Sequence, residues 1–103
     1  MSQKHTAFQI KVWNACKKIP KGRVSTYKGI AHLINSRGYR AVGGALNKNP
    51  YAPHVPCHRV VASDGSLGGY EGGLKKKILL LKKEGVKVKG KKIVDFEKKV
   101  WKK

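Results

Sequence analysis

Acidic side chains are scarce in this chain of 103 residues, which has five Asp and Glu against 24 Lys and Arg and a formal net charge of +19 at pH 7. Such an excess of one sign makes a folded chain repel itself unless a polyanion binds to it. Nucleic acid is therefore the first partner class to consider. A lysine-rich composition also keeps small proteins in solution and suits hot habitats, so charge alone favours nucleic acid only modestly.

Long apolar runs are also missing. No stretch approaches the roughly 20 residues of a membrane-spanning helix, and no apolar signal-peptide core follows Met1. The sequence thus predicts a soluble cytoplasmic protein with no membrane partner. An apolar content of 40% suits one compact core rather than two. We expect residues 1–103 to form a single domain, without a separate N-terminal domain, and to act as a monomer.

Cysteine is rare as well, with Cys16 and Cys57 as the two examples. Two cysteines are too few for a disulfide framework, and they show no metal-ligand spacing with the four histidines. We therefore expect no bound metal, and no motif calls for another cofactor. Cys16 falls on the apolar stripe of a predicted helix and should belong to the core. Cys57 stands between Pro56 and His58 and is the candidate nucleophile.

The first half of the chain predicts a helix-turn-helix. Apolar residues at helical intervals over residues 8–19 indicate a first helix, which Pro20 stops. Ser25 or Thr26 can cap a second helix, which ends within residues 35–38. A third helix follows after a short turn, which gives the outline of a helix-turn-helix.

The third predicted helix begins at Tyr39 or Arg40. We expect Tyr39, Val42 and Leu46 on its core side, and Ala41, Gly44, Ala45 and Lys48 on the other. Gly43 and Gly44 each cost a helix roughly 1 kcal/mol relative to alanine, so they need a compensating reason. It is either close approach to a sugar-phosphate wall in a minor groove or tight packing against another helix. Arg40 favours the first, because a cation at the positive end of the helix dipole is better explained by a target outside the helix.

The second half is predicted to hold less regular structure. Three prolines interrupt residues 49–56, and residues 58–62 indicate a short strand. A glycine-rich loop over residues 65–73 leads into a last helix, which Gly85 closes. Residues 86–94 are predicted to form a small hairpin. The fold class is therefore mainly α with a small β element, around a single compact core.

Cys57 has neighbours that suit a reactive thiol. His58 and Arg59 both favour the thiolate, which is the nucleophilic form. Side chains that are adjacent in an extended chain point to opposite faces, so contact between Cys57 and His58 needs either a turn or a bridging water, and we expect the water. Glu84 stands in the last turn of a predicted helix, where the dipole disfavours a carboxylate unless it has a partner. Glu84 either accepts the imidazole N–H of His58, which gives a relay from carboxylate through histidine and water to thiol, or is simply solvated.

Ten short motifs spread from Phe8 to Gly85 resemble, in content and order, those of the O6-alkylguanine-DNA alkyltransferases, also called methylated-DNA–protein-cysteine methyltransferases. They are Phe8-Gln9, Val12-Trp13, Ile19-Pro20, Thr26-Tyr27, Arg40-Ala41-Val42-Gly43, Asn49-Pro50, Pro56-Cys57-His58-Arg59-Val60-Val61, Gly69-Tyr70, Gly72-Gly73 and Glu84-Gly85. The Pro-Cys-His-Arg segment is the most specific of them.

The resemblance implies a winged-helix-like domain that binds the minor groove of duplex DNA containing O6-alkylguanine, flips the damaged nucleotide and moves its alkyl group once, irreversibly, to Cys57. By similarity, Arg40 fills the vacated base stack. Tyr27 pushes on the adjacent phosphate and donates a proton to the departing guanine. His58 relays the thiol proton through water to Glu84. No metal or organic cofactor takes part.

The resemblance also assigns the pocket and the DNA contacts. Asn49 is the hinge that ties the turn before the cysteine to the recognition helix. Val60, Tyr70 and Glu71 line the substrate pocket, with Tyr70 in its lid; Glu71 stands where small residues are common in the family, so the range of alkyl groups is expected to differ. The implied DNA-binding residues are Arg40, Thr26, Lys28, Ser36, Ala41, Gly43, Gly44, Ala45 and Ser63.

Three other functions compete with alkyl transfer. An alkyltransferase-like protein recognises the damaged base without repairing it, but such proteins lack the acceptor cysteine. A winged-helix DNA-binding regulator fits the charge and the helices, but leaves the Pro-Cys-His-Arg segment without a purpose. A Cys-His hydrolase requires an oxyanion hole, which the sequence does not reveal.

Overall fold

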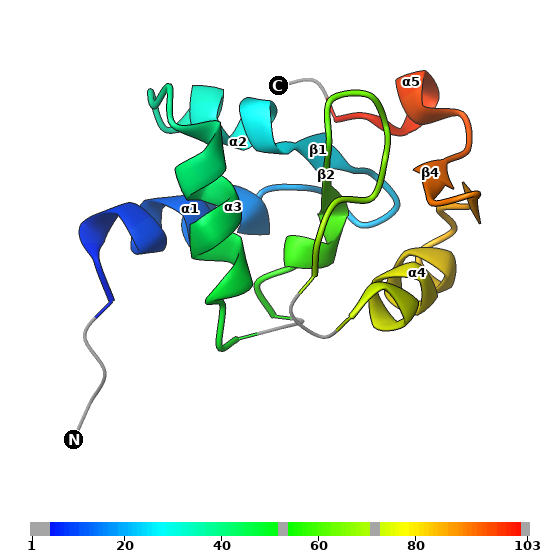
Figure 1. Ribbon diagram of the computed structural model, residues 1–103, viewed down its shortest axis with the longest axis horizontal. Helices are drawn as coiled ribbons and strands as arrows, with labels where there is room; N and C mark the ends of the chain where they lie inside the picture. Colours follow the sequence, from blue (N-terminus) through cyan, green and yellow to red (C-terminus); the bar gives the residue numbers. More distant parts are fainter. Residues whose placement is uncertain (1–4, 52–53, 71–72, 102–103) are drawn as a thin grey trace.

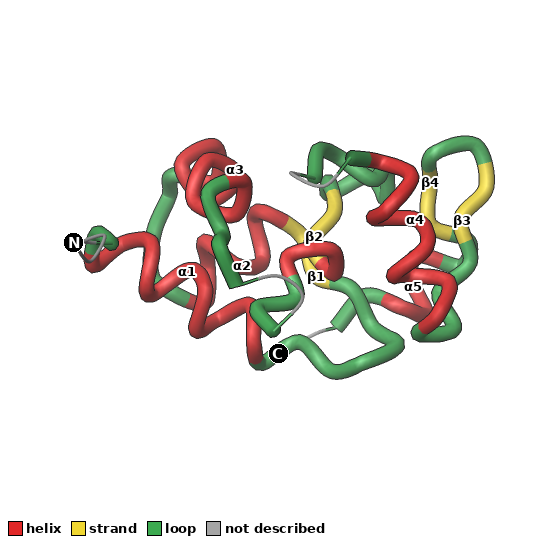
Figure 2. The backbone as a smooth tube through the Cα atoms, turned by 90° about the horizontal axis from the view of Figure 1, so that it is seen from below, coloured by secondary structure: helices red, strands yellow, loops and turns green. Residues whose placement is uncertain are grey.

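A computed structural model of the chain describes residues 5–51, 54–70 and 73–101. In chain order, the elements are α1 (Ala7–Lys17), β1 (Ser25–Thr26), α2 (Tyr27–Leu33), α3 (Tyr39–Asn47), the 3-10 turn η1 (Cys57–Arg59), β2 (Val60–Val61), α4 (Leu74–Lys83), β3 (Val88–Lys89), β4 (Lys92–Ile93) and α5 (Phe96–Lys99). The β1–β2 pair lies in the middle of the molecule. Helices α1, α2 and α3 gather on one side of it, and α4, the β3–β4 hairpin and α5 lie on the other (Figures 1 and 2).

Helix α1 has a well-defined start. The Thr6 hydroxyl accepts the Gln9 N–H at 3.0 Å, and the Gln9 side chain accepts the Thr6 N–H at 3.0 Å, so two N–H groups of the first turn are satisfied. The helix ends at Lys17, two residues before the predicted Ile19. The apolar stripe is confirmed, and Cys16 is fully buried in it.

The predicted helix-turn-helix is confirmed in α2 and α3. Thr26 caps α2 by accepting the Gly29 N–H at 2.8 Å. Helix α3 begins at Tyr39 and packs against both α1 and α2. The Trp13 indole of α1 donates to the Ala45 carbonyl at 2.9 Å, which fixes α3 across the bundle.

Two assignments within α3 were wrong. Tyr39 was placed on the core side, but its side chain is 47% exposed, because the first turn of α3 lies over a surface pocket rather than over the core. Ala45 was placed on the exposed, DNA-binding side, but it is only 4% exposed. The core stripe of α3 runs through Val42, Ala45 and Leu46, so Ala45 cannot offer its side chain to a partner.

The short β element differs from the expectation. Residues 58–62 were predicted as one strand, but His58 and Arg59 belong to the turn η1, and the Arg59 N–H bonds back to the Pro56 carbonyl at 2.9 Å. The strand is limited to Val60–Val61, which pairs in parallel with Ser25–Thr26. This pairing brings the residue before Tyr27 next to the chain that leaves Cys57.

The predicted C-terminal helix and hairpin are confirmed. Helix α4 is closed by Gly85 at a positive φ of 83°, where glycine is favoured. The β3–β4 hairpin is antiparallel, and its chain then forms α5, which the sequence did not indicate. The residues after α5 return to the middle of the molecule. There, Val24 donates its N–H to the Lys99 carbonyl at 3.0 Å and accepts the Trp101 N–H at 2.7 Å.

The expected fold class, mainly helical with a small β element, is confirmed, and the buried residues fall into two clusters. The first lies among α1, α2 and α3 and includes Cys57 and Val60. The second lies between the β1–β2 pair and the C-terminal elements and includes Val61. Because neighbouring side chains of a strand point to opposite faces, Val60 and Val61 join different clusters. In the described ranges, no helix has the length and apolar character needed to cross a membrane.

Candidate active site

Cys57 is the first residue of η1 and its side chain is only 6% exposed. The Asn49 amide nitrogen lies 3.4 Å from Cys57 Sγ and donates to the Val55 carbonyl at 2.9 Å. The Asn49 amide oxygen in turn accepts the Tyr51 N–H at 2.9 Å. Asn49 lies two residues after the end of α3, so one buried side chain connects this helix to the thiol.

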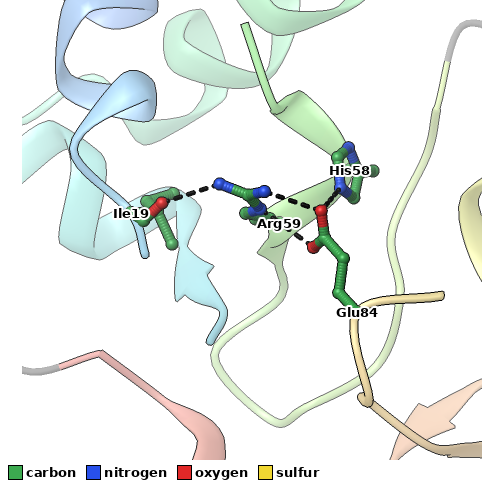
Figure 3. Close-up of polar contacts among 4 residues, drawn as sticks. All are labelled: Ile19, His58, Arg59 and Glu84. Carbon is green, nitrogen blue, oxygen red and sulfur yellow. Dashed lines mark hydrogen bonds and ion pairs between the residues drawn. The ribbon is translucent and has the colours of Figure 1, made fainter. Parts of the chain in front are cut away.

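His58, Arg59 and Glu84 form a polar cluster in which His58 is buried and the other two side chains are partly buried (Figure 3). His58 Nε2 lies 3.1 Å from Glu84 Oε2. Arg59 donates two hydrogen bonds to the same carboxylate, at 2.9 and 2.6 Å. It donates a third to the Ile19 carbonyl at 2.8 Å. Glu84 therefore has two cationic or potentially cationic partners, and η1 is tied to the segment after α1 as well as to the end of α4.

Burial sets the charge states of this group. Burial lowers the pKa of His58, and the contact with Glu84 only partly offsets that effect. Burial alone raises the pKa of Glu84, but the hydrogen bonds from Arg59 and His58 outweigh it and the net pKa is lowered. At neutral pH the pair is thus a neutral imidazole and a carboxylate. Nε2 faces the carboxylate, but neither ring nitrogen meets hydrogen-bond geometry with any atom of residues 5–51, 54–70 and 73–101. A proton on Nε2, toward the carboxylate, leaves Nδ1 as the basic nitrogen.

Arg59 is held in place by Glu84 and by the segment after α1. Its three side-chain hydrogen bonds go to the Glu84 carboxylate and to the Ile19 carbonyl. Lys77 is a further cation that interacts with Cys57, and sequence reasoning missed it. Burial lowers the pKa of Lys77 to about 8, and interactions with Cys57 and Cys16 act in the opposite direction.

Lys77 is fully buried in α4, which is rare for a lysine. Its ammonium group donates to the carbonyls of Val60, Leu67 and Gly69, at 2.8 Å for Val60 and 3.1 Å for Gly69. These bonds tie the strand that follows Cys57 to the loop that leads to Tyr70. The signal in the sequence was its position: Lys77 lies on the same side of the helix as Leu74 and Leu81, where an apolar residue is expected.

Cys16 is the second thiol of the protein, and its surroundings make it unreactive. It is fully buried, and burial raises its pKa far above the ordinary range of a thiol. In the described part of the chain, no cluster of three or more His, Cys, Asp and Glu side chains could hold a metal ion.

Tyr27 is half-buried at the start of α2, between α3 and the glycine-rich loop. A side chain added at Gly68 would lie 3.0 Å from Tyr27 Cε2 and closer still to its hydroxyl, and φ of Gly68 is +69°. Burial raises the pKa of Tyr27, although a hydrogen bond with the Gly69 backbone opposes the rise. The phenol therefore stays protonated at neutral pH and can donate a proton.

The exposed side of α3 is open. A Cβ added to Gly44 would meet no described atom within 4 Å, and one added to Gly43 would make an ordinary contact with Tyr27 at 3.9 Å. Tight packing within the molecule therefore explains neither glycine. Arg40 and Ala41 are exposed on the same helix, so the surface lacks bulky side chains except at its first turn.

The remaining predicted site residues are distributed around this centre. Lys28 and Ser63 are exposed, whereas the hydroxyls of Thr26 and Ser36 accept backbone N–H groups and so have local structural roles. Val60 is fully buried, and Tyr70 is half-buried and packs against the first core cluster. Glu71 lies outside the described residues.

Comparison with known proteins adds independent evidence. Residues 7–86 match the family described as 6-O-methylguanine DNA methyltransferase, DNA binding domain. The methylated-DNA–protein-cysteine methyltransferase of Methanosarcina acetivorans is 54% identical over 81 residues, which are 78% of this chain and 52% of that protein. The inducible enzyme of the same name from Bacillus subtilis is 51% identical over 77 residues, or 74% of this chain and 43% of that protein. The chain thus spans about half the length of the curated relatives it matches.

Solved structures agree with this assignment. The Mycobacterium tuberculosis OGT in complex with DNA has a TM-score of 0.77 and 45% identity, covering 82% of this chain and 52% of that chain. S. pombe Atl1, in complex with damaged DNA containing O6-carboxymethylguanine, has a TM-score of 0.85 and 30% identity, covering 98% of this chain and 100% of that chain. From the family match and these identities, the chain belongs to the 6-O-methylguanine DNA methyltransferase family.

Proposed function

We propose that this chain repairs O6-alkylguanine in duplex DNA by transferring the alkyl group to Cys57, once per molecule. The observation that carries the proposal is the buried Cys57 thiol, placed beside Asn49 and next to the His58–Glu84 pair in a chain of this family. Nothing in this chemistry requires a metal or an organic cofactor, because the thiol itself is the acceptor.

The reaction is a displacement at the alkyl carbon. His58 takes the thiol proton through a bridging water at Nδ1, and Glu84 stabilises the imidazolium that forms. The Cys57 sulfur then forms a bond to the alkyl carbon as the bond from that carbon to O6 breaks. The departing guanine keeps the electron pair and takes a proton from the Tyr27 phenol. The thioether product has no facile route back to a thiol, so each molecule reacts once.

The DNA is bound through α3 and the first turn of α2. The nearly bare surface of Ala41, Gly43 and Gly44 lets the helix backbone approach the minor groove, and Arg40 fills the space that the flipped nucleotide leaves. Lys28 and Ser63, with Thr26 and Ser36, contact phosphates. Ala41, Gly43 and Gly44 carry no side chain long enough to read base edges, which fits binding without sequence specificity. This function places the protein in the cytoplasm, with the nucleoid as its site of action in a prokaryotic cell.

A second candidate function is damage sensing without repair. The likeness to S. pombe Atl1 over nearly the whole of both chains favours it, since the structure of that protein holds damaged DNA containing O6-carboxymethylguanine. The two functions differ at one measurable point, because only repair makes a new covalent bond on the protein.

The deciding experiment is the intact mass of the protein after incubation with a duplex carrying one O6-methylguanine, followed by peptide mapping. Repair adds one methyl group to Cys57 and stops at one per protein. Tight binding to the damaged duplex with no gain in mass would establish the sensor instead.

Gly68→Ala should reduce alkyl transfer. The added methyl group collides with the Tyr27 ring and hydroxyl, and the positive φ of Gly68 disfavours any side chain. We expect the displaced phenol to slow transfer from duplex O6-methylguanine about tenfold or more, measured by single-turnover kinetics. Gly69→Ala is the matched control, since a Cβ there meets nothing within 4 Å. Equal rates for both variants and the parent would remove Tyr27 from the mechanism.

The rate of transfer should depend on pH through His58. Because burial lowers the His58 pKa, the base is fully neutral at pH 7, and the rate falls only below the ordinary histidine value of about 6.5. The free energy of unfolding should also fall on acidification. His58 of the unfolded chain is protonated at a higher pH than His58 of the folded chain, so stability is lost as the pH falls from about 6.5 through the lowered pKa. The check is the pH profile of the reaction with free O6-benzylguanine. His58→Asn should remove the inflection, and a profile unchanged by that variant would exclude His58 as the base.

A further inference from the structure

A pocket of about 220 Å³ lies between the first turns of α2 and α3 and the residues just after β2. Its lining residues are Tyr27, Lys28, Tyr39, Ala62 and Ser63. Pockets for drug-sized ligands usually measure roughly 300–1,000 Å³, so this one suits a smaller group. Of the lining residues, Tyr39 is the one that directly precedes Arg40 in α3.

Tyr39 has no structural role that explains its position. Its side chain is 47% exposed, and within the described ranges no hydrogen bond reaches its hydroxyl. An aromatic side chain on the first turn of an otherwise small-residue surface is costly to leave in water. Its location suggests that something covers it during function.

The chemistry of the walls defines the occupant. The ring faces of Tyr27 and Tyr39, with the Ala62 methyl group, offer apolar surface. Lys28 adds a positive charge, Tyr27, Tyr39 and Ser63 add hydroxyl groups, and no acidic residue of the described ranges lines the pocket. A group that fits must pair an apolar part with an anionic part, as a deoxyribose with its phosphate does.

The pocket also lies next to the residues assigned to base flipping. Tyr27 forms one wall, and Arg40 follows Tyr39 directly in α3. A strand whose sugar–phosphate unit entered the pocket would pass beside the guanidinium of Arg40. The pocket would thus hold the backbone while the neighbouring nucleotide leaves the stack.

We propose that this pocket seats one sugar–phosphate unit of the damaged strand between Tyr27 and Tyr39, and that Tyr39 is a positioning residue for nucleotide flipping. The ring of Tyr39 packs on the sugar, and its hydroxyl donates a hydrogen bond to the phosphate. The inference rests on the proposed function, and it adds to that function a residue with no part in the chemistry at the thiol.

The test compares Tyr39→Phe and Tyr39→Ala with the parent on duplex O6-methylguanine and on free O6-benzylguanine. Loss of a hydrogen bond to a charged group should slow duplex repair about tenfold in Tyr39→Phe, and loss of the ring should slow it further in Tyr39→Ala. The reaction with the free base should not change. Tyr51→Phe is the matched control, because Tyr51 is equally exposed, at 48%, and lies outside the pocket.

A second measurement identifies the phosphate. A set of duplexes, each with one methylphosphonate near the lesion, removes one backbone charge at a time. At a single position, the neutral linkage should slow repair by the parent protein as much as Tyr39→Phe slows repair of the ordinary duplex. The variant and the neutral linkage together should slow repair no more than either change alone. Because tyrosine is uncharged, Tyr39→Phe should leave the salt dependence of DNA binding unchanged, whereas Lys28→Ala should reduce its slope by about one.

The outcomes separate this inference from the proposed function. The pocket does not hold the backbone if Tyr39→Ala repairs duplex DNA as fast as the parent. The same conclusion follows if the variant loses the same factor in repair rate whichever phosphate is replaced by a methylphosphonate. If instead the parent gains no alkyl group from free O6-benzylguanine or from DNA, alkyl transfer itself fails. In that case duplex binding by Tyr39→Ala, compared with the parent, still decides whether the pocket takes a sugar–phosphate unit.

Discussion

Cys57→Ala abolishes the gain in mass from O6-methylguanine DNA and leaves binding to the damaged duplex within a fewfold of the parent. The acceptor sulfur is lost, and the other thiol cannot replace it, because Cys16 is fully buried and burial raises its pKa. The DNA-binding surface proposed for α3 is unaffected by the change. Intact mass and a gel-shift titration on the same duplex measure the two effects together.

Cys16→Ala is the control for this experiment. It removes a thiol of the same core cluster, so it reports the effect of losing a sulfur from the core without touching the acceptor. Alkyl transfer should remain stoichiometric, although the smaller side chain lowers stability by about 1 kcal/mol or more. Continued alkylation of Cys57→Ala would show that the acceptor lies elsewhere in the chain.

Lys77→Met destabilises the protein by about 3 kcal/mol and suppresses alkyl transfer. Methionine fills a similar volume but leaves the carbonyls of Val60, Leu67 and Gly69 without their donor, and each unsatisfied buried carbonyl costs about 1 kcal/mol or more. Removing a buried ammonium also relieves its own desolvation, which keeps the loss from being larger. For a domain of this size the loss corresponds to a fall in Tm of roughly 15 °C.

The loss of transfer has a separate cause and a separate measurement. Lys77 is a cation that interacts with Cys57, so its removal disfavours the thiolate. The reaction with free O6-benzylguanine, followed well below the Tm of the variant, should be at least tenfold slower than in the parent. Lys76→Met, on the exposed side of the same helix, should change neither the Tm nor the rate. A Lys77→Met protein that keeps both its Tm and its rate would show that the buried ammonium is dispensable.

The helical part of the fold was predictable because its signals are local. The spacing of apolar residues in α1, the hydroxyl of Thr26 before α2 and the glycine after α4 each act within one or two turns. The contact of Glu84 with His58 was also predictable, since a carboxylate at a helix end needs a partner. The sequence pattern of α3 assigned Tyr39 and Ala45 to the wrong sides of the helix, because packing against other elements decides which side is buried.

The rest depended on contacts between distant segments. A strand of two residues, such as β1, has no alternation to detect, and it exists because β2 lies beside it. Lys77 is buried because three backbone carbonyls from two other segments converge on its ammonium, and no pattern within α4 reveals them. The turn at Cys57 follows from the hydrogen bond between Arg59 and Pro56, whereas the two valines after it suggested a longer strand.

The return of the chain after α5 has a practical consequence for reagents built on this protein. Val24 bonds on one edge to Lys99 and Trp101 and leads within three residues to Tyr27 (Figure 1). A dye attached next to Trp101 would therefore lie close to Tyr27 and to the DNA-binding side proposed for it. Labels intended to report on DNA binding belong there.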